Sequence, residues 1–257
     1  MYGAIIGDIV GSRFELRNID TKDFTFFHPT CRCTDDSIMT LAVYDALIVC
    51  DGVYDNLSAH TVRSMQTFGR QNPHAGYGRG FRRWLFSTDP QPYNSYGNGA
   101  AMRVSPCGWF GRTLDEVKEL SYKVTCVTHN QPEGLKGAEA TAVAVFLART
   151  GHSMASIREA MRNYYALDFT LESIGPTYRF DVTCQGTLPY ALAAFFESTS
   201  FEDAIRNAVS IGGDSDTLAA IAGGIAEAYW GIPDDMIATA NRYLGLEQSL
   251  SYPAARR

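Results

Sequence analysis

The chain has 257 residues, of which 46% are hydrophobic and 19% charged, and its formal net charge at pH 7 is −6. This composition is ordinary for a compact globular protein, and the length suits one domain over residues 1–257. The acidic balance, without a long basic stretch, argues against nonspecific nucleic-acid binding. A phosphate ligand would therefore need local cations, backbone N–H groups or metals.

The six cysteines are scattered, apart from Cys31 and Cys33, and none has the spacing of a zinc knuckle. No apolar run reaches the ~20 residues that cross a bilayer, and no signal peptide is visible. We therefore expect a cytoplasmic protein with reduced thiols and no membrane partner. For Cys31 and Cys33 the simplest interpretation is packing as loop thiols.

The first predicted element is a helix of small residues near the N-terminus, which runs into a loop at Glu15. Gly3, Gly7 and Gly11 share one face at four-residue spacing, which allows a neighbouring helix to approach closely. We expect Asp8 to bond a neighbouring helix end or to support a metal ligand. From spacing alone, Glu15 is a solvated loop carboxylate.

Further along the chain, apolar residues recur at three- and four-residue steps, which predicts helices. The predicted helical stretches are residues 37–47, 133–149, 188–196, 201–209 and 218–229. The last is followed by Gly231 and Pro233, an order typical of a helix end. Because strand signals are sparse, the sequence predicts an all-α, compact orthogonal helix bundle.

Three stretches without periodicity, residues 17–33, 72–98 and 168–183, are predicted to be long loops, which in compact domains are usually functional or disordered. The middle loop combines glycines with aromatic residues, a composition untypical of disorder. These residues are Gly76, Gly78, Gly80, Gly97 and Gly99, with Tyr77, Phe81, Trp84, Tyr93 and Tyr96. The pattern indicates backbone that comes close to a flat, polar ligand.

Two acidic clusters each precede an apolar helical stripe: residues 34–37, Thr-Asp-Asp-Ser, and residues 212–217, Gly-Gly-Asp-Ser-Asp-Thr. Helix capping would explain one carboxylate in such a place. Each cluster has two carboxylates and no basic residue, however, and adjacent carboxylates raise each other's pKa unless a cation compensates. If the helix starts converge, their oxygens suit two hard divalent ions. From the residues alone, capping and a binuclear site both remain open.

These features together resemble the ADP-ribosylglycohydrolase family over nearly the whole chain. The resemblance rests on residues 7–15, 34–37, 95–103, 128–129 and 213–217. The pairing of Thr-Asp-Asp with Asp-x-Asp-Thr is highly specific, and the Asn-Gly…Met-Arg segment lies between them as in the family. The resemblance implies an all-α fold with a binuclear magnesium or manganese centre.

The resemblance also implies roles for individual residues. The metal ligands of two Mg²⁺ or Mn²⁺ ions would be Thr34, Asp35, Asp36, Asp214, Asp216 and Thr217. ADP-ribose would be bound by Gly76, Gly78, Gly80, Ser95, Tyr96, Gly97, Asn98 and His129. Glu15, in Gly11-Ser12-x-Phe14-Glu15, matches the glutamate of the branch that hydrolyses O-linked ADP-ribose. Without the resemblance, His129 would be interpreted as a capping or core histidine.

The implied reaction is hydrolysis of the glycosidic bond between ADP-ribose and a modified macromolecule, a protein or a nucleic acid, with ADP-ribose as product. We expect Glu15 to be the main acid/base, and Asp214 or Asp36 to orient the attacking water. Candidates for stacking on adenine are Tyr77, Phe81, Tyr96 and Tyr178. Two alternatives remain: a non-catalytic relative, such as a lens crystallin, and a binuclear-metal phosphohydrolase.

Overall fold

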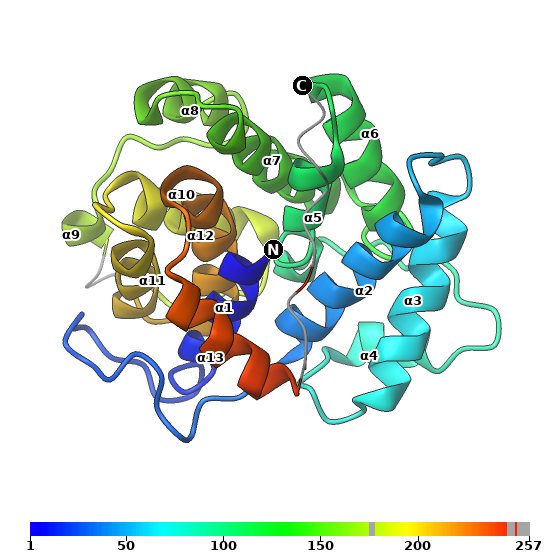
Figure 1. Cartoon of the computed structure of the whole chain (residues 1–257), viewed down its shortest axis with the longest axis horizontal. Helices are drawn as coiled ribbons and strands as arrows, with labels where there is room; N and C mark the ends of the chain where they lie inside the picture. The colour runs from blue at the N-terminus through cyan, green and yellow to red at the C-terminus, as the bar shows by residue number, and fades with distance from the viewer. Residues whose placement is uncertain (175–177, 246–249, 251–257) are drawn as a thin grey trace.

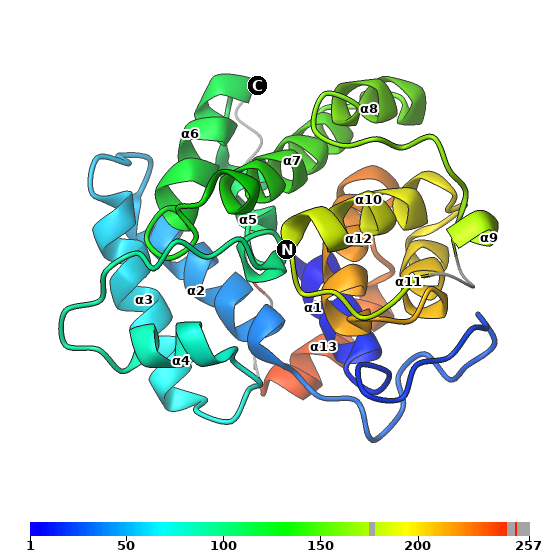
Figure 2. The same cartoon turned by 180° about the vertical axis from the view of Figure 1, so that it is seen from behind.

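The chain folds almost entirely into helices, as the computed structural model shows for residues 1–174, 178–245 and 250 (Figures 1 and 2). Within these residues the only β-type pairing is an isolated bridge between Gly97 and Thr183. The prediction of an all-α fold is therefore confirmed. No helix in the described ranges is both long and apolar enough to span a membrane.

Two helices rich in small residues, α1 (Tyr2–Gly11) and α12 (Ser215–Trp230), pack together in the middle of the fold (Figure 1). Every residue of α1 is buried. A Cβ atom on Gly3 or Gly7 would overlap the backbone oxygen of Gly223 or Ala219 of α12. The close helix approach predicted from the glycine spacing is thus confirmed, and it brings the end of α1 to the start of α12.

Two groups of helices flank this central pair (Figures 1 and 2). The first comprises α2 (Asp35–Cys50), α3 (Leu57–Gln71), α4 (Arg79–Leu85) and α6 (Leu114–Thr125). The second comprises α9 (Leu171–Ile174), α10 (Cys184–Phe196) and α11 (Phe201–Ser210). The remaining elements are η1 (Asn98–Ala100), α5 (Ser105–Phe110), α7 (Pro132–Arg149), α8 (Met154–Met161) and α13 (Asp234–Leu244). Helix α7 packs against α6, α10 and α12, so it connects the two groups.

The five stretches predicted as helices correspond to α2, α7, α10, α11 and α12, and residues 17–33 form the expected loop. The prediction of one uninterrupted loop over residues 72–98 is wrong, because α4 lies within it. Phe81, Trp84 and Leu85 are buried at helical spacing, and their burial outweighs the low helix propensity of Gly80. The predicted loop 168–183 contains the short α9, and residues 175–177 lie outside the described residues.

Candidate active site

A pocket of about 390 Å³ lies where the starts of α2 and α12 meet the loop after α1 and the segment around η1. One part of its lining is acidic and consists of Glu15, Asp35, Asp36, Asp214 and Asp216, together with Thr217. The other part comes from the glycine-rich stretches and includes Gly76, Gly78, Gly80, Ser95, Gly97, Asn98, Gly99 and His129. The volume is in the range of small-molecule sites.

The start of α2 is stabilised by a carboxylate from another helix. Asp8 of α1 is fully buried and accepts hydrogen bonds from the backbone N–H groups of Thr34 at 2.9 Å and Ser37 at 3.0 Å. It also accepts from the hydroxyls of Thr34, at 2.6 Å, and Ser37. Because Asp8 caps the helix, Asp36 is released from that task. The buried Oδ1 atom of Asp36 has no partner among the described residues.

The start of α12 is built from a glycine turn and a side-chain amide. Gly212 and Gly213 have φ values of 79° and 70°, in the left-handed region that favours glycine. Asp214 then occupies the N-cap position, but its side chain makes no capping bond to α12. Instead it accepts a 2.7 Å hydrogen bond from the Nδ2 atom of Asn98. Capping therefore does not explain Asp214, whereas Thr34 does cap α2.

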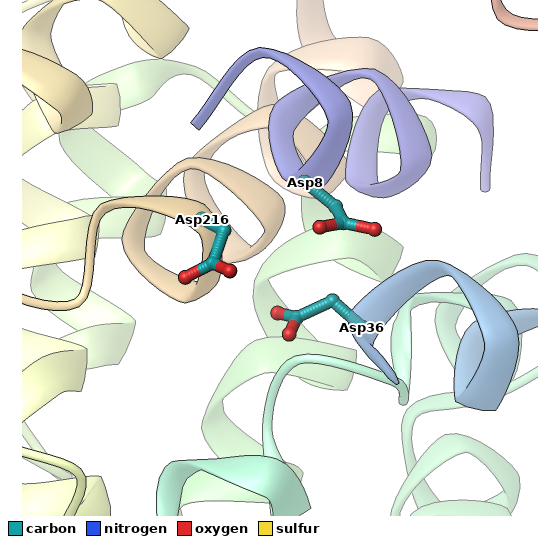
Figure 3. A group of neighbouring side chains, drawn as sticks. All are labelled: Asp8, Asp36 and Asp216. Carbon is teal, nitrogen blue, oxygen red and sulfur yellow. The ribbon is translucent and has the colours of Figure 1, made fainter. Parts of the chain in front are cut away.

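The two helix starts converge, as the sequence predicts if they share a metal site. Carboxylate oxygens of Asp8, Asp36 and Asp216 lie within 4.8 Å of one another, and these side chains point toward a common space (Figure 3). Oxygens of Glu15, Asp214 and Asp216 form a second such group. Asp216 belongs to both groups, so the two candidate cation positions adjoin.

Burial and mutual repulsion make these carboxylates hard to ionise together. Burial, followed by neighbouring carboxylates, raises the pKa of Asp36 and of Asp216 well above the ordinary value. Burial, and then Asp8, raises the pKa of Asp35 to about 7. Hard oxygen donors at this spacing, with one orphaned buried oxygen on Asp36, fit a divalent cation that would compensate their charge.

Glu15 lies half-buried in the loop that follows α1, where it forms the second carboxylate group with Asp214 and Asp216. Burial raises its pKa, and the charge of Asp214 raises it further, whereas Arg32 lowers it. The interpretation of Glu15 as a fully solvated loop carboxylate, which spacing alone favoured, is therefore wrong. Its acid form is stabilised at the point where it faces the pocket.

The sequence-predicted ADP-ribose contacts are brought together, with one exception. Tyr96 is 48% exposed and lies outside the pocket lining that contains its neighbours Ser95 and Gly97. Of the aromatic candidates, Phe81 lines the pocket, and the unpredicted Phe180 joins it. Tyr178 instead packs its ring against Gly213. The ligand contacts themselves stay a prediction.

Thr34 and the cysteines have simpler surroundings than the other predicted residues. The Thr34 hydroxyl donates to Asp8, and it lies 3.4 Å from Asp36 Oδ2 behind the pocket lining.

All six cysteines are free thiols. Burial raises the pKa of Cys33 to about 12 and that of Cys31 in the same direction, so both stay protonated, as packing residues do.

The roles of two polar residues of the site were not indicated by the sequence. Asn18 exchanges two 2.9 Å hydrogen bonds with the backbone of Gly213 and also donates to the carbonyl of Phe14 at 2.7 Å. It thereby ties the Glu15 loop to the turn before Asp214. Arg103 is buried in the pocket lining beside His129. Asn18 belongs to no motif, and Arg103 ends the Asn-Gly…Met-Arg segment without a signal of its contacts, because the partners of both residues are distant along the chain.

Comparison with known proteins shows the family of the chain. The family model described as ADP-ribosylglycohydrolase matches residues 1–254, so the chain belongs to the ADP-ribosylglycohydrolase family and is a hydrolase. It is 26% identical over 309 residues to the ADP-ribosylhydrolase ARH3 of Bos taurus, covering 90% of this chain and 83% of the relative.

A bacterial relative and a solved structure are similar over comparable lengths. The ADP-ribosylarginine hydrolase Tri1 of Pseudomonas putida is 26% identical over 269 residues, which cover 90% of this chain and 70% of the relative. A structure titled "ADP-ribosylglycohydrolase-related protein complex" has a TM-score of 0.68 at 23% identity and covers 96% of each chain. This last similarity supports the fold alone.

Proposed function

We propose that the chain removes ADP-ribose from a modified macromolecule, most simply a protein, by metal-dependent hydrolysis of the glycosidic bond. The observation that carries the proposal is the convergence of Glu15, Asp214 and Asp216 at the pocket that the glycine-rich segments also line. A ligand in this pocket would contact carboxylates and backbone N–H groups together. This combination suits a sugar joined to a pyrophosphate.

The metal ligands in this proposal are Thr34, Asp35, Asp36, Asp214, Asp216 and Thr217. Two Mg²⁺ or Mn²⁺ ions held there would compensate the carboxylates and bind sugar hydroxyls. The two carboxylate groups that share Asp216 support a pair of ions. Asp8 belongs to the first group, but its oxygens already accept four hydrogen bonds, which suits support of the ligands.

Proton transfer is assigned to Glu15. Because burial and Asp214 raise its pKa, the protonated carboxyl can donate a proton to the leaving group as the bond at the anomeric carbon breaks. Asp214, oriented by Asn98, or Asp36 would position the attacking water, and the proton that this water loses would restore the acid form of Glu15. Gly76, Gly78, Gly80, Ser95, Tyr96, Gly97, Asn98 and His129 would bind ADP-ribose.

Within this reaction we propose a preference for O-linked over arginine-linked ADP-ribose. The support is Glu15 within Gly11-Ser12-x-Phe14-Glu15, which resembles the branch that hydrolyses O-linked ADP-ribose. The relative Tri1, named an ADP-ribosylarginine hydrolase, has the same identity of 26% as the relative ARH3, so overall similarity favours neither linkage. The linkage is therefore tested separately from the reaction.

The deciding experiment incubates serine- and arginine-linked ADP-ribosyl proteins with the enzyme and Mg²⁺ and identifies products by mass spectrometry. We expect intact ADP-ribose and the unmodified target, released faster from the serine-linked substrate. Release of AMP would instead indicate a phosphohydrolase.

The role of Glu15 is tested with Glu15→Gln. The hydrolysis rate of this variant should fall by at least the ~10²-fold typical of a missing acid, while its affinity for ADP-ribose stays within about tenfold. The exposed Glu159→Gln is the matched control, and a parental rate for Glu15→Gln would contradict the assignment.

A further inference from the structure

Arg103 is a buried cation in the pocket lining that the proposed reaction does not use. Its side chain is 1% exposed, and no carboxylate pairs with it among the ion pairs of residues 1–174, 178–245 and 250. Its Nε atom is buried without a partner, and Phe81 lies 5.7 Å from its Cζ atom. Burying a charge that has no ion-pair partner is costly in free energy.

The hydrogen bonds of Arg103 lead to His129. Its Nη2 atom donates to the Thr128 hydroxyl at 2.7 Å, and that hydroxyl lies 2.8 Å from Nδ1 of His129. Nη2 itself is 3.4 Å from the same Nδ1 atom. A guanidinium only donates, whereas a hydroxyl both accepts and donates. The Thr128 hydroxyl could also donate to the Thr125 carbonyl, at 3.4 Å, but its contact with Nδ1 is much shorter. A proton on Nδ1 would in addition face the N–H of a cation, so Nδ1 is left as an acceptor.

The opposite nitrogen of the ring faces the glycine-rich wall. Nε2 of His129 lies 3.6 Å and 3.5 Å from the points where Cβ atoms on Gly97 and Gly99 would stand. Both glycines and His129 line the pocket. Burial, and then the charge of Arg103, lower the pKa of His129 well below its ordinary value, so the ring is neutral at neutral pH. A neutral ring whose Nδ1 accepts carries its proton on Nε2.

We propose that Arg103 is a positioning residue which, through Thr128, holds His129 as a fixed Nε2–H donor toward an anionic oxygen of the ligand. A donor held in one orientation needs no reorganisation when the ligand binds. The positive charge of Arg103 behind the ring favours a phosphate oxygen over a neutral hydroxyl. The ligand part of this inference rests on the proposed function, whereas the state of the ring does not.

The state of the ring is tested by ¹⁵N NMR of histidine-labelled protein without ligand, assigned with His129→Gln. We expect one neutral form, protonated at Nε2, in the wild type. Arg103→Met removes the charge and the donor, so signals of the Nδ1-protonated or doubly protonated ring should appear, and Arg103→Lys should restore the wild-type pattern. An unchanged His129 spectrum in a folded Arg103→Met variant would overturn the proposal.

Should Arg103→Met fail to fold, Thr128→Val and Thr128→Ser form a matched pair, because only serine keeps the hydroxyl. Calorimetric titration uses ADP, which has the pyrophosphate, and adenosine, which lacks it. Thr128→Val should weaken ADP binding by about five- to tenfold, the equivalent of one hydrogen bond, while Thr128→Ser stays within about twofold. Adenosine binding should not change in either variant.

The two ways of failing are distinguishable. If the wild type binds ADP but Thr128→Val binds it equally well, the relay through Thr128 is wrong. If the wild type binds neither ADP nor ADP-ribose while the NMR signals of His129 respond to Arg103→Met as expected, the proposed function fails and the positioning of the ring stands.

Discussion

The starts of α2 and α12 have similar acidic residues but are held in place by different parts of the molecule. At α2 the supporting group is the buried carboxylate of Asp8, which comes from the central helix α1. At α12 the support comes from η1 and from the loop after α1: Asn98 bonds Asp214, and Asn18 bonds the backbone of Gly213. One half of the site is therefore fixed by the core, and the other half by segments that border the pocket.

Because of this difference, we expect substitutions near the two helix starts to affect stability and turnover differently. Disturbing the support of α2 should damage both the fold and the site, because Asp8 is fully buried among backbone donors. Disturbing the support of α12 should mainly change how Glu15 and Asp214 meet the substrate. Water can replace hydrogen bonds at a partly exposed loop, but it cannot restore the orientation of the reacting groups.

The largest effect should come from removing one carboxylate of either helix start. Asp36→Ala and Asp216→Ala should each lower hydrolysis by about 10³-fold or more, because each takes an oxygen from a candidate cation position that is worth several kcal/mol. Rates are measured with saturating Mg²⁺ and after chelation, with the exposed Asp55→Ala as control. Substantial activity in excess chelator would show that hydrolysis does not depend on a metal held by these clusters.

The next effect concerns Asp8 and the α2 half of the site. Asp8→Asn keeps the shape but turns an NH₂ group toward the donors of Thr34 and Ser37. We expect the unfolding free energy to fall by about 1–3 kcal/mol and metal affinity to fall by about 10–100-fold. Denaturant unfolding and metal titration measure the two quantities. A variant with lower activity but wild-type stability would remove the distinction between the two helix starts.

A smaller effect is expected for Asn18 in the α12 half. Asn18→Ala releases the Glu15 loop from Gly213, and we expect kcat to fall by about tenfold, since misplaced reacting groups lose rate more than binding. The unfolding free energy should change by only about 1 kcal/mol. Asn163→Ala, which removes one local loop contact, is the control. A loss of metal affinity as large as that of Asp8→Asn would contradict this division.

What the sequence could predict was set by distance along the chain. Helices α2, α7 and α12 were predictable because their apolar residues recur locally, and the acidic clusters were visible because each is contiguous. The partners of the site were not, since Asn18 and Gly213 lie 195 residues apart. Arg103 and Thr128, 25 residues apart, follow no motif spacing that would indicate contact. Such pairs form only after the helices pack.

The same reasoning explains two errors. Helix α4 was missed because the stretch shows no clear periodicity and its glycines among aromatic residues indicated irregular backbone near a ligand, whereas tertiary burial of Trp84 and Leu85 determined the structure. Glu15 was interpreted as a solvated carboxylate because its spacing gave no sign of a partner. In the fold it is half-buried and belongs to one carboxylate group with Asp214 and Asp216, which are distant in sequence.

The smallest expected effect is a pH dependence of stability that the metal should remove. Burial and Asp8 raise the pKa of Asp35 to about 7, from 3.8 for an ordinary aspartate. Between these values the folded chain binds more protons than the unfolded chain at this group, so its contribution to stability falls as pH rises. A divalent ion binds the ionised carboxylate and should offset the loss.

The measurement is thermal unfolding of the wild type and Asp35→Asn across this pH range, with chelator and with Mg²⁺. Taking the difference between the two proteins cancels other titrating groups. In chelator the wild type should lose stability relative to the variant as pH rises, on the order of 1 kcal/mol because Asp35 borders an open pocket, or roughly 2–4 °C. With Mg²⁺ the trend should flatten or reverse, since only the aspartate can ligate the ion as an anion. If the stability difference between the two proteins does not change with Mg²⁺, the cation binds elsewhere and the start of α2 has no role in binding it.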